Sequence, residues 1–145
     1  MSIPKLLDLL ELEKPKKPSK IGGVVVKSEG QVLLVRRSET AGKYPNFWAV
    51  PMGHVEEGEK FIQGAHREFQ EETMLDIDIN SLVYLDTLKD SKYNRIVKLY
   101  MIELPNKPEP KLDEEHSDYG YYDVKSLPRP IEDNLRVALE LKAWV

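Results

Sequence analysis

The chain has 145 residues and no cysteine, so it fits one domain with a sizeable buried core and excludes disulfides, thiolate catalysis and cysteine-held zinc. Its formal net charge of −4 at pH 7 supplies no field that recruits nucleic acid, and we expect no stable nucleic-acid partner. No apolar run approaches the roughly 20 residues that cross a bilayer and no apolar secretory core follows Met1, so we expect a cytoplasmic protein without a membrane partner.

Residues 1–20 read as an N-terminal arm, which precedes a single domain at 21–145. Five leucines in the arm suit one short amphipathic helix: Leu6, Leu7, Leu9, Leu10 and Leu12. Two prolines among four lysines in "KPKKPSK" would then end that helix. A loosely tethered arm is one interpretation. A segment that covers the domain surface or helps to form a homodimer is the other.

The domain opens with two expected strands at 21–27 and 31–37, joined by a tight turn that contains glycine. Both strands carry continuous apolar runs, which are typical of strands covered on both faces. A polar loop follows at 38–46. The segment 47–55, "FWAVPMGHV", then reads as a short strand that Pro51 interrupts.

An amphipathic helix is expected next. Bulky or apolar positions recur at spacings of three and four and form one stripe of this helix: Phe61, Ile62, Ala65, Phe69 and Thr73. Glu59 and Lys60 suit its beginning. Two more strands are expected at 81–88 and 94–104, with a turn at 89–93 between them.

The last part of the chain should hold a proline-broken acidic loop at 105–118, a short strand at 119–124 and a terminal helix at 131–144. One side of that helix would carry four residues: Leu135, Ala138, Leu139 and Lys142. Several strands with one helix in mid-chain and one at the end predict a mixed α/β sandwich.

Three glutamates of the mid-chain helix share one face, because Glu68, Glu71 and Glu72 stand at positions i, i+3 and i+4. Each like-charge pair there costs about 0.2–0.5 kcal/mol when nothing compensates it. Three hard oxygen donors in one patch suit Mg²⁺ or Mn²⁺, with water and substrate phosphate completing the coordination. A solvated acidic helix face is the alternative interpretation.

The spacing around these glutamates matches a known pattern. Gly53, five residues, Glu59, seven residues and then "REFQEE" at 67–72 resemble the Nudix box, GX5EX7REUXEEXGU with U a bulky aliphatic residue. Phe69 is aromatic at the first U position, and Met74 replaces the last glycine. A glycine there commonly takes a left-handed conformation that costs methionine on the order of 1 kcal/mol. We therefore expect the helix to end one or two residues away from the usual position.

The resemblance to the Nudix family implies an α/β fold, specifically a Nudix-type α/β/α sandwich with a mixed β-sheet, the box helix and a C-terminal helix. It also implies hydrolysis of the pyrophosphate bond in a nucleoside diphosphate linked to another moiety, with one to three Mg²⁺ or Mn²⁺ ions. Nucleotide sugars, ADP-ribose and dinucleoside polyphosphates are the favoured substrates, and a nucleoside triphosphate remains a candidate.

Three other interpretations stay open. A Nudix-fold sensor would bind a nucleotide without cleaving it. A prenyl diphosphate isomerase of the same fold would rely on an additional cysteine, which this chain lacks. An acidic helix that docks a basic partner would show no dependence on metal.

The resemblance also implies roles for individual residues. The expected metal ligands are Glu68, Glu71, Glu72, the backbone carbonyl of Met52, and Glu115 from a distant loop. Glu114 and Asp118 are reserve candidates for that loop acid. The expected catalytic residues are Glu68, Arg67, Glu59 and Glu115. Glu68 would be a metal ligand or the general base, and Arg67 and Glu59 would orient it. The expected substrate-binding residues are Arg36, Arg37, Trp48 and His54.

Overall fold

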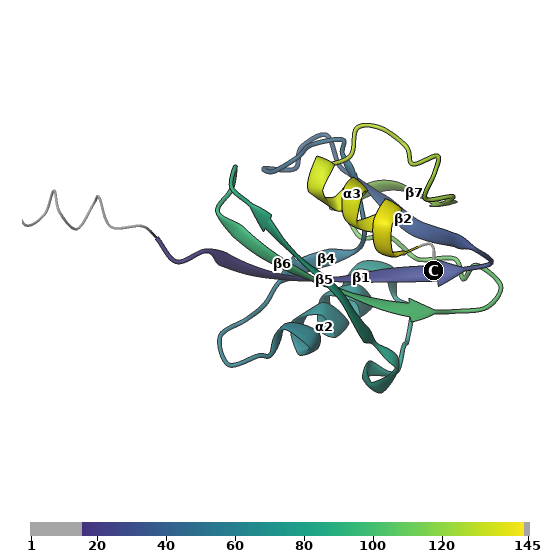
Figure 1. The fold of residues 1–145 in the computed structure, drawn as a ribbon, viewed down its shortest axis with the longest axis horizontal. Helices are drawn as coiled ribbons and strands as arrows, with labels where there is room; N and C mark the ends of the chain where they lie inside the picture. Colours follow the sequence, from purple (N-terminus) through teal and green to yellow (C-terminus); the bar gives the residue numbers. More distant parts are fainter. Residues whose placement is uncertain (1–15, 144–145) are drawn as a thin grey trace, which may run out of the picture.

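The structure, a computed structural model, describes residues 16–143 (Figure 1). The expected arm helix and Trp144 lie outside these residues. The described elements, in chain order, are β1 (Ser19–Ser28), β2 (Gln31–Arg37), β3 (Trp48–Ala49), β4 (Met52–His54), α2 (Phe61–Thr73), the 3₁₀ helix η1 (Ile79–Ser81), β5 (Val83–Asp90), β6 (Arg95–Glu103), β7 (His116–Tyr122) and α3 (Asp133–Lys142). Neither described α-helix is long and apolar enough to cross a membrane.

The strands form one mixed sheet in the order β3-β2-β1-β6-β5, with β4 paired to β1 and β7 paired to β2. β1 and β6 run parallel, in a register that extends from Ser19↔Arg95 to Lys27↔Glu103. All other strand pairs are antiparallel. Since β1 pairs with both β6 and β4, it holds the box segment against the middle of the sheet.

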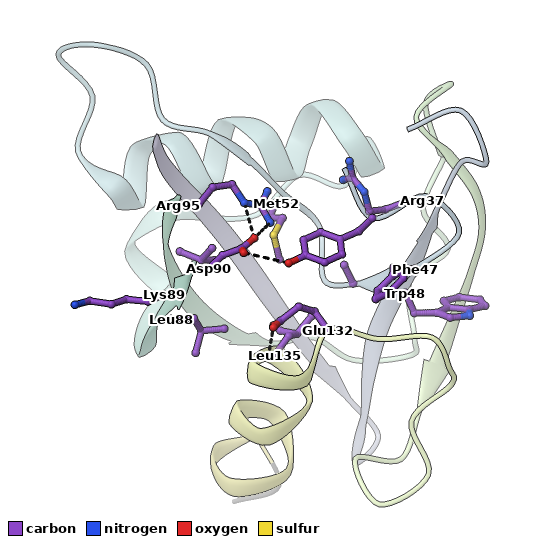
Figure 2. Close-up of a pocket in the computed structure, with 13 residues that line it drawn as sticks. Arg37, Phe47, Trp48, Met52, Leu88, Lys89, Asp90, Arg95, Glu132 and Leu135 are labelled. Carbon is purple, nitrogen blue, oxygen red and sulfur yellow. Dashed lines mark hydrogen bonds and ion pairs between the residues drawn. The ribbon is translucent and has the colours of Figure 1, made fainter. Parts of the chain in front are cut away.

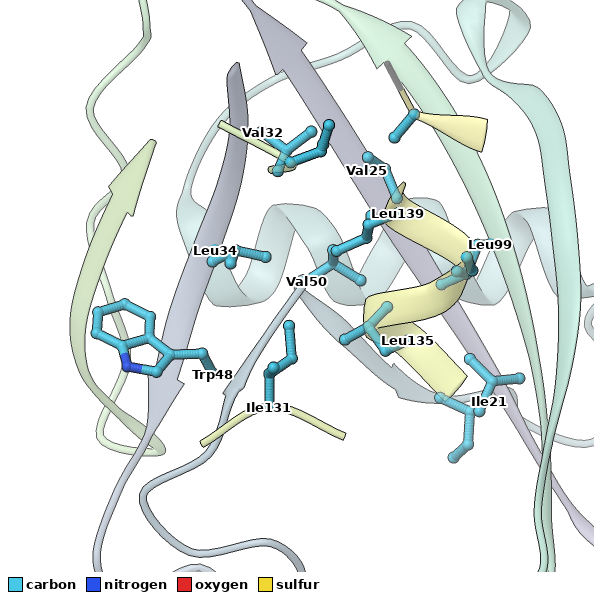
Figure 3. Packing of buried hydrophobic residues seen from close by; sticks show 14 residues of the cluster. Ile21, Val25, Val32, Leu34, Trp48, Val50, Leu99, Ile131, Leu135 and Leu139 are labelled. Carbon is cyan, nitrogen blue, oxygen red and sulfur yellow. The ribbon is translucent and has the colours of Figure 1, made fainter. Parts of the chain in front are cut away.

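Helices cover both faces of the sheet, with α3 on one side and α2 on the other (Figure 1). Val24 and Val26 of β1 pack into the cluster that contains Phe69 of α2. Val25 points to the opposite face, where it packs in one cluster with Leu139 of α3 (Figure 3). This alternation confirms that the central strand is covered on both faces, and the α/β/α sandwich is the observed fold.

α2 lies so close to β1 that only glycine fits between them. A Cβ atom added to Gly22 would stand 2.7 Å from the backbone nitrogen of Ala65. The close approach brings the acidic end of α2 over β4, because the β1 residues Ile21 to Gly23 pair with β4. The sheet thereby fixes how far the glutamates of α2 stand from Met52 and Gly53 of β4.

The helix end differs from the sequence expectation. α2 ends at Thr73, and Met74 itself takes the left-handed conformation, with φ 59° and ψ 17°. The backbone N–H of Met74 donates to the carbonyl of Gln70 at 2.9 Å. The prediction that the helix would end elsewhere was wrong, because the methionine accepts the strained conformation and keeps the exit of the helix in place.

Two boundaries near the C-terminus and the orientation of one side chain also differ. The expected loop at 105–118 is too long, because β7 already begins at His116, where it pairs with Arg37. The last helix begins at Asp133, since the side chain of Glu132 accepts the N–H of Leu135 at 2.9 Å and caps it. Lys142 does not lie on the buried side of this helix.

The reason for the last difference is an ion pair. Lys142 is exposed, and its Nζ lies 3.1 Å from Oδ1 of Asp86 on β5. The buried side of α3 is formed by Leu135, Ala138 and Leu139, as expected. The helical period predicted that Lys142 lies on the same side as these residues. Instead, its charged group pairs with Asp86 at the edge of the contact between α3 and the sheet.

Candidate active site

A cavity of about 520 Å³ lies where α2 faces β4 and two loops. Its walls come from β1, the end of β2 and the loop after it, β4, α2, the start of β6 and the loop before β7. Among the lining residues are Arg37, Lys43, Met52, Gly53, His54, Glu68, Glu72, Arg95, Glu114 and Glu115. Acidic residues of α2 and of the last loop therefore face basic residues of the first loop and of β6.

Arg67 is the centre of a hydrogen-bond network at the edge of this cavity. Its Nε and one terminal nitrogen donate to the two oxygens of Glu59, each at 3.0 Å. Its other terminal nitrogen donates to Glu68 at 3.0 Å and approaches Glu71 at 3.3 Å. The hydrogen bond from Arg67 lowers the pKa of Glu59, and the bond to Glu59 raises the pKa of Arg67. This is the arrangement that an orienting role for Arg67 and Glu59 requires.

Glu68 lies directly over Gly53. A Cβ atom added to Gly53 would collide with the carboxylate of Glu68. The first glycine of the box is therefore needed for space, and not for an unusual backbone conformation. Burial raises the pKa of Glu68, although its hydrogen bond with Arg67 acts in the opposite direction.

Glu72 is the most deeply buried carboxyl group of the site. The residue is 3% exposed, and its Oε2 has no hydrogen-bond partner among residues 16–143. Burial, followed by the neighbouring charge of Glu68, raises the pKa of Glu72 to about 9, against a backbone hydrogen bond from Met52. A buried carboxylate oxygen without a partner is costly, and a bound cation would compensate it.

The donors around this orphaned oxygen fit a hard divalent ion. Glu68, Glu72 and Glu115 line the same cavity, and Met52 contributes to its wall. Within the described part of the chain, however, no three acidic or histidine side chains stand close enough together to hold an ion as they are placed. Glu71 does not line the cavity: its side chain is 58% exposed and rests on Arg67.

The loop acids are placed by the segment that precedes β7. The carbonyl of Glu115 accepts the N–H of Ser38 at 2.9 Å, which ties this segment to the loop after β2. Nδ1 of His116 lies 2.8 Å from Asp113, so the histidine serves the turn and does not line the cavity. Glu114 and Glu115 reach the cavity wall, whereas Asp118 lies on β7, paired with Arg36.

The four expected substrate-binding residues are not all brought to the cavity. Arg37 and His54 line it. Arg36 does not, since its Nε donates to the carbonyl of Asn46 at 3.3 Å. Trp48 is only 7% exposed, and it packs in the hydrophobic core around α3 and forms part of the wall of a second, smaller cavity.

This second cavity has a volume of about 40 Å³ and lies between α3 and the tip of the β5–β6 hairpin (Figure 2). Leu88, Leu135 and Phe47 make it largely apolar, with Asp90 and Glu132 as its acidic residues. It adjoins the larger cavity, because Arg37, Met52 and Arg95 line both.

The sequence did not single out Asp90 and Arg95. Asp90 and Arg95 close the β5–β6 hairpin as register partners and form an ion pair at 2.9 Å. Burial raises the pKa of Asp90, but hydrogen bonds from the Tyr93 backbone and the Arg95 side chain outweigh it, and the net effect lowers this pKa. The turn lies at 91–94 and not at the expected 89–93, and the opposite charges directly before and after it were the available signal, since an antiparallel hairpin places such residues opposite each other.

Comparisons with known proteins identify the family and the fold of this chain. A sequence model of the NUDIX domain matches residues 16–143. The chain is 28% identical over 113 residues to the nucleoside triphosphatase NudI of Escherichia coli, across 71% of this chain and 80% of that protein. It is 51% identical over 45 residues to the m7GpppN-mRNA hydrolase NUDT17 of Xenopus laevis, across 31% of this chain and only 15% of that protein. A MutT NUDIX hydrolase structure from Burkholderia pseudomallei superimposes with a TM-score of 0.73 at 24% identity, covering 86% of this chain and 98% of that one.

Proposed function

Because this chain belongs to the NUDIX domain family, we propose that it is a pyrophosphohydrolase that uses water to split the phosphoanhydride of a nucleoside diphosphate linked to another moiety. Mg²⁺ or Mn²⁺ is its cofactor. The similarity to a nucleoside triphosphatase over 71% of the chain supports this reaction class. The observation that carries the proposal is the orphaned oxygen of Glu72, buried beside Glu68 in a cavity large enough for a diphosphate.

Glu72 and Glu68 would hold the divalent ion, with Glu115 and the carbonyl of Met52 approaching from the other walls of the cavity. A divalent ion at this place supplies charge neutralisation for phosphate oxygens and lowers the pKa of the attacking water. Glu71 stays a predicted ligand. It would have to turn away from Arg67, which it approaches at 3.3 Å, before it could contribute.

The chain's own residues position the water and accept its proton. Water attacks one phosphorus, the bridging P–O bond breaks, and the proton of the water passes to a carboxylate of the site. Glu68 suits that acceptor, because burial raises its pKa and Arg67 fixes its orientation. Glu59 holds Arg67 in turn, through both of its oxygens. Glu68 also remains a candidate metal ligand, and these two roles are separable by experiment.

A substrate panel with and without metal tests the proposal. Nucleotide sugars, ADP-ribose, dinucleoside polyphosphates and nucleoside triphosphates are incubated with Mg²⁺ or Mn²⁺, and phosphate or mononucleotide release is measured. At least one substrate should be turned over only when the ion is present. Turnover that persists in excess chelator would contradict the proposed chemistry. Binding without turnover across the whole panel would favour the nucleotide sensor instead.

Glu72→Gln is the matched variant, because it keeps the shape of the side chain and removes the charge. We expect kcat to fall by about 10²-fold or more, since second-sphere partners alone are worth 10- to 100-fold. Glu140→Gln, on the exposed outer side of α3, is the control and should leave kcat unchanged. The homodimer, the number of ions and the cytoplasmic location stay predictions.

A further inference from the structure

We propose that Arg37 and Arg95 together bind an anionic group of the substrate beyond the cleaved anhydride, so that the preferred substrates carry three or more phosphates in a row. Asp90 and Tyr44 act as positioning residues that hold Arg95 at this place. The inference rests on the proposed hydrolase function for its kinetic consequences. The anion site itself stands on the geometry of the two guanidinium groups.

The two arginines stand at the junction of the two cavities, because only Arg37, Met52 and Arg95 line both of them among the described residues. Figure 2 shows these three side chains along one side of the smaller cavity, opposite Leu135 and Glu132 of the α3 end. A substrate whose phosphates start at the carboxylates of the larger cavity and extend toward the smaller one would pass this junction.

Arg37 forms no ion pair within residues 16–143. Its Nε donates to the carbonyl of Lys43 at 2.8 Å, and no ion pair or hydrogen bond engages its two terminal nitrogens. Burial, and then the positive charge of Arg95, lower the pKa of Arg37, while Glu72 and Glu115 act in the opposite direction. The two guanidinium groups thus repel each other, and a phosphate between them would relieve that repulsion and accept their free N–H groups.

Arg95 is held by Asp90 and by two aromatic rings, since its guanidinium carbon lies 5.7 Å from the ring centroid of Tyr44 and 6.0 Å from that of Tyr93. Its Nε and one terminal nitrogen reach Oδ2 of Asp90 at 3.0 and 2.9 Å. Oδ1 of Asp90 accepts from the hydroxyl of Tyr44 at 3.1 Å and from the backbone of Tyr93 at 3.2 Å. The other terminal nitrogen of Arg95 has no hydrogen-bond partner in the described chain, so one donor stays available for a ligand.

The surroundings of Arg95 add positive charge. Nζ of Lys92 lies 5.4 Å from the ring of Tyr44 and 5.3 Å from that of Tyr93. Nζ of Lys43 lies 5.7 Å from the Tyr93 ring. The two carboxylates of the smaller cavity are already engaged, Asp90 by Arg95 and Glu132 by the first turn of α3. A neutral sugar needs no such concentration of cations, whereas a further phosphate group does.

Arg95→Gln tests the anion site without any catalysis. Inorganic tripolyphosphate is titrated into the metal-free protein in chelator, and binding is followed by calorimetry. The variant should bind tripolyphosphate about 10- to 100-fold more weakly, the range for one charge-assisted hydrogen bond. Arg136→Gln, the same change on the outside of α3, should bind as the unmodified protein does. Equal binding by Arg95→Gln and the unmodified protein would overturn the anion site.

The kinetic test separates substrate classes. For a nucleoside triphosphate or a dinucleoside tetraphosphate, Arg95→Gln should raise KM about 10- to 100-fold with little change in kcat, since the lost contact is uniform binding. For ADP-ribose, which has only two phosphates, KM should change less than about threefold. An equal rise of KM for both classes would overturn the substrate inference. Tripolyphosphate binding through Arg95 in a protein that hydrolyses nothing would sink the hydrolase proposal and leave the anion site intact.

Asp90→Asn tests positioning. This variant should reproduce the rise of KM for the triphosphate. The double variant with Arg95→Gln should show no larger rise of KM than Arg95→Gln alone, because the two residues act as one unit. Tyr44→Phe, which removes only a hydroxyl group, should raise KM about two- to fivefold and keeps the test possible if Asp90→Asn folds poorly. If the effects of the two substitutions on KM were additive in the double variant, Asp90 would not act through Arg95.

Discussion

Arg67 and Glu59 form a two-point pair, in which Nε and a terminal nitrogen of Arg67 each lie 3.0 Å from one oxygen of the same carboxylate. The pair joins α2 to the loop in front of it and leaves the remaining terminal nitrogen for Glu68. A planar fork can make both sets of contacts at once, whereas a lysine has a single charged nitrogen. The orientation of Glu68 therefore depends on the shape of the guanidinium group as well as on its charge.

Replacing this fork gives the first prediction. Arg67→Lys should lower kcat about 10- to 100-fold, because a misplaced Glu68 costs rate even when the charge balance is kept. KM should change little. Steady-state kinetics on the best substrate of the panel measure the effect, and Arg136→Lys on the exposed side of α3 is the control. Full activity of Arg67→Lys would show that Glu68 needs no such support.

The space over Gly53 gives the second prediction. Gly53→Ala should lower kcat by about 10²-fold or more, since its Cβ atom would push the Glu68 carboxylate out of position. Gly42→Ala is the matched control, because it lines the same cavity and an added Cβ atom there meets nothing within 4 Å. Equal rates for both variants would contradict the close packing of Glu68 on Gly53.

The third prediction concerns pH. Burial raises the pKa of Glu72 from its ordinary 4.5 to about 9, so the native state binds a proton that the unfolded state has released. The free energy of unfolding of the metal-free protein should therefore fall as pH rises from about 4.5 to about 9. Urea unfolding in chelator at several pH values measures this slope.

Glu72→Gln carries no titrating group at this position, so it should lack that part of the slope. Near pH 8 in chelator, we expect it to be more stable than the unmodified protein by about 1–3 kcal/mol. The difference should vanish below pH 4.5, where Glu72 is protonated in both states. Identical slopes for the two proteins would show that Glu72 is not buried as a carboxyl without a partner.

The left-handed methionine gives the fourth prediction. Met74→Gly should raise the free energy of unfolding by about 1 kcal/mol, because glycine takes a φ of 59° without steric cost. Removing the side chain of Met74 should cost little free energy of unfolding, since the residue is 69% exposed. Met74→Ala keeps a Cβ atom and should bring no such gain. A loss of stability in the glycine variant, measured by urea unfolding, would contradict the strain.

Local patterns were sufficient for most of the fold. The apolar run at Val24–Val26 indicated a strand covered on both faces, and the stripe through Ala65 and Phe69 indicated the helix that covers one of them. Such patterns depend on neighbours two to four positions away, which the sequence displays directly. The spacing from Gly53 to Glu72 likewise identified the acidic segment of the site, because the residues of that segment are close together in the chain.

Tertiary structure alone decided the electrostatics of the site. Glu71 and Glu72 are adjacent in sequence, yet the first stays exposed on Arg67 while the second is buried with an oxygen that lacks a partner among the described residues. The positions of Arg95 and Asp90 at the wall of the cavity follow from the folding of a distant hairpin toward the loop after β2. Burial and long-range pairing set these charges, and both arise only when segments far apart in the chain pack together.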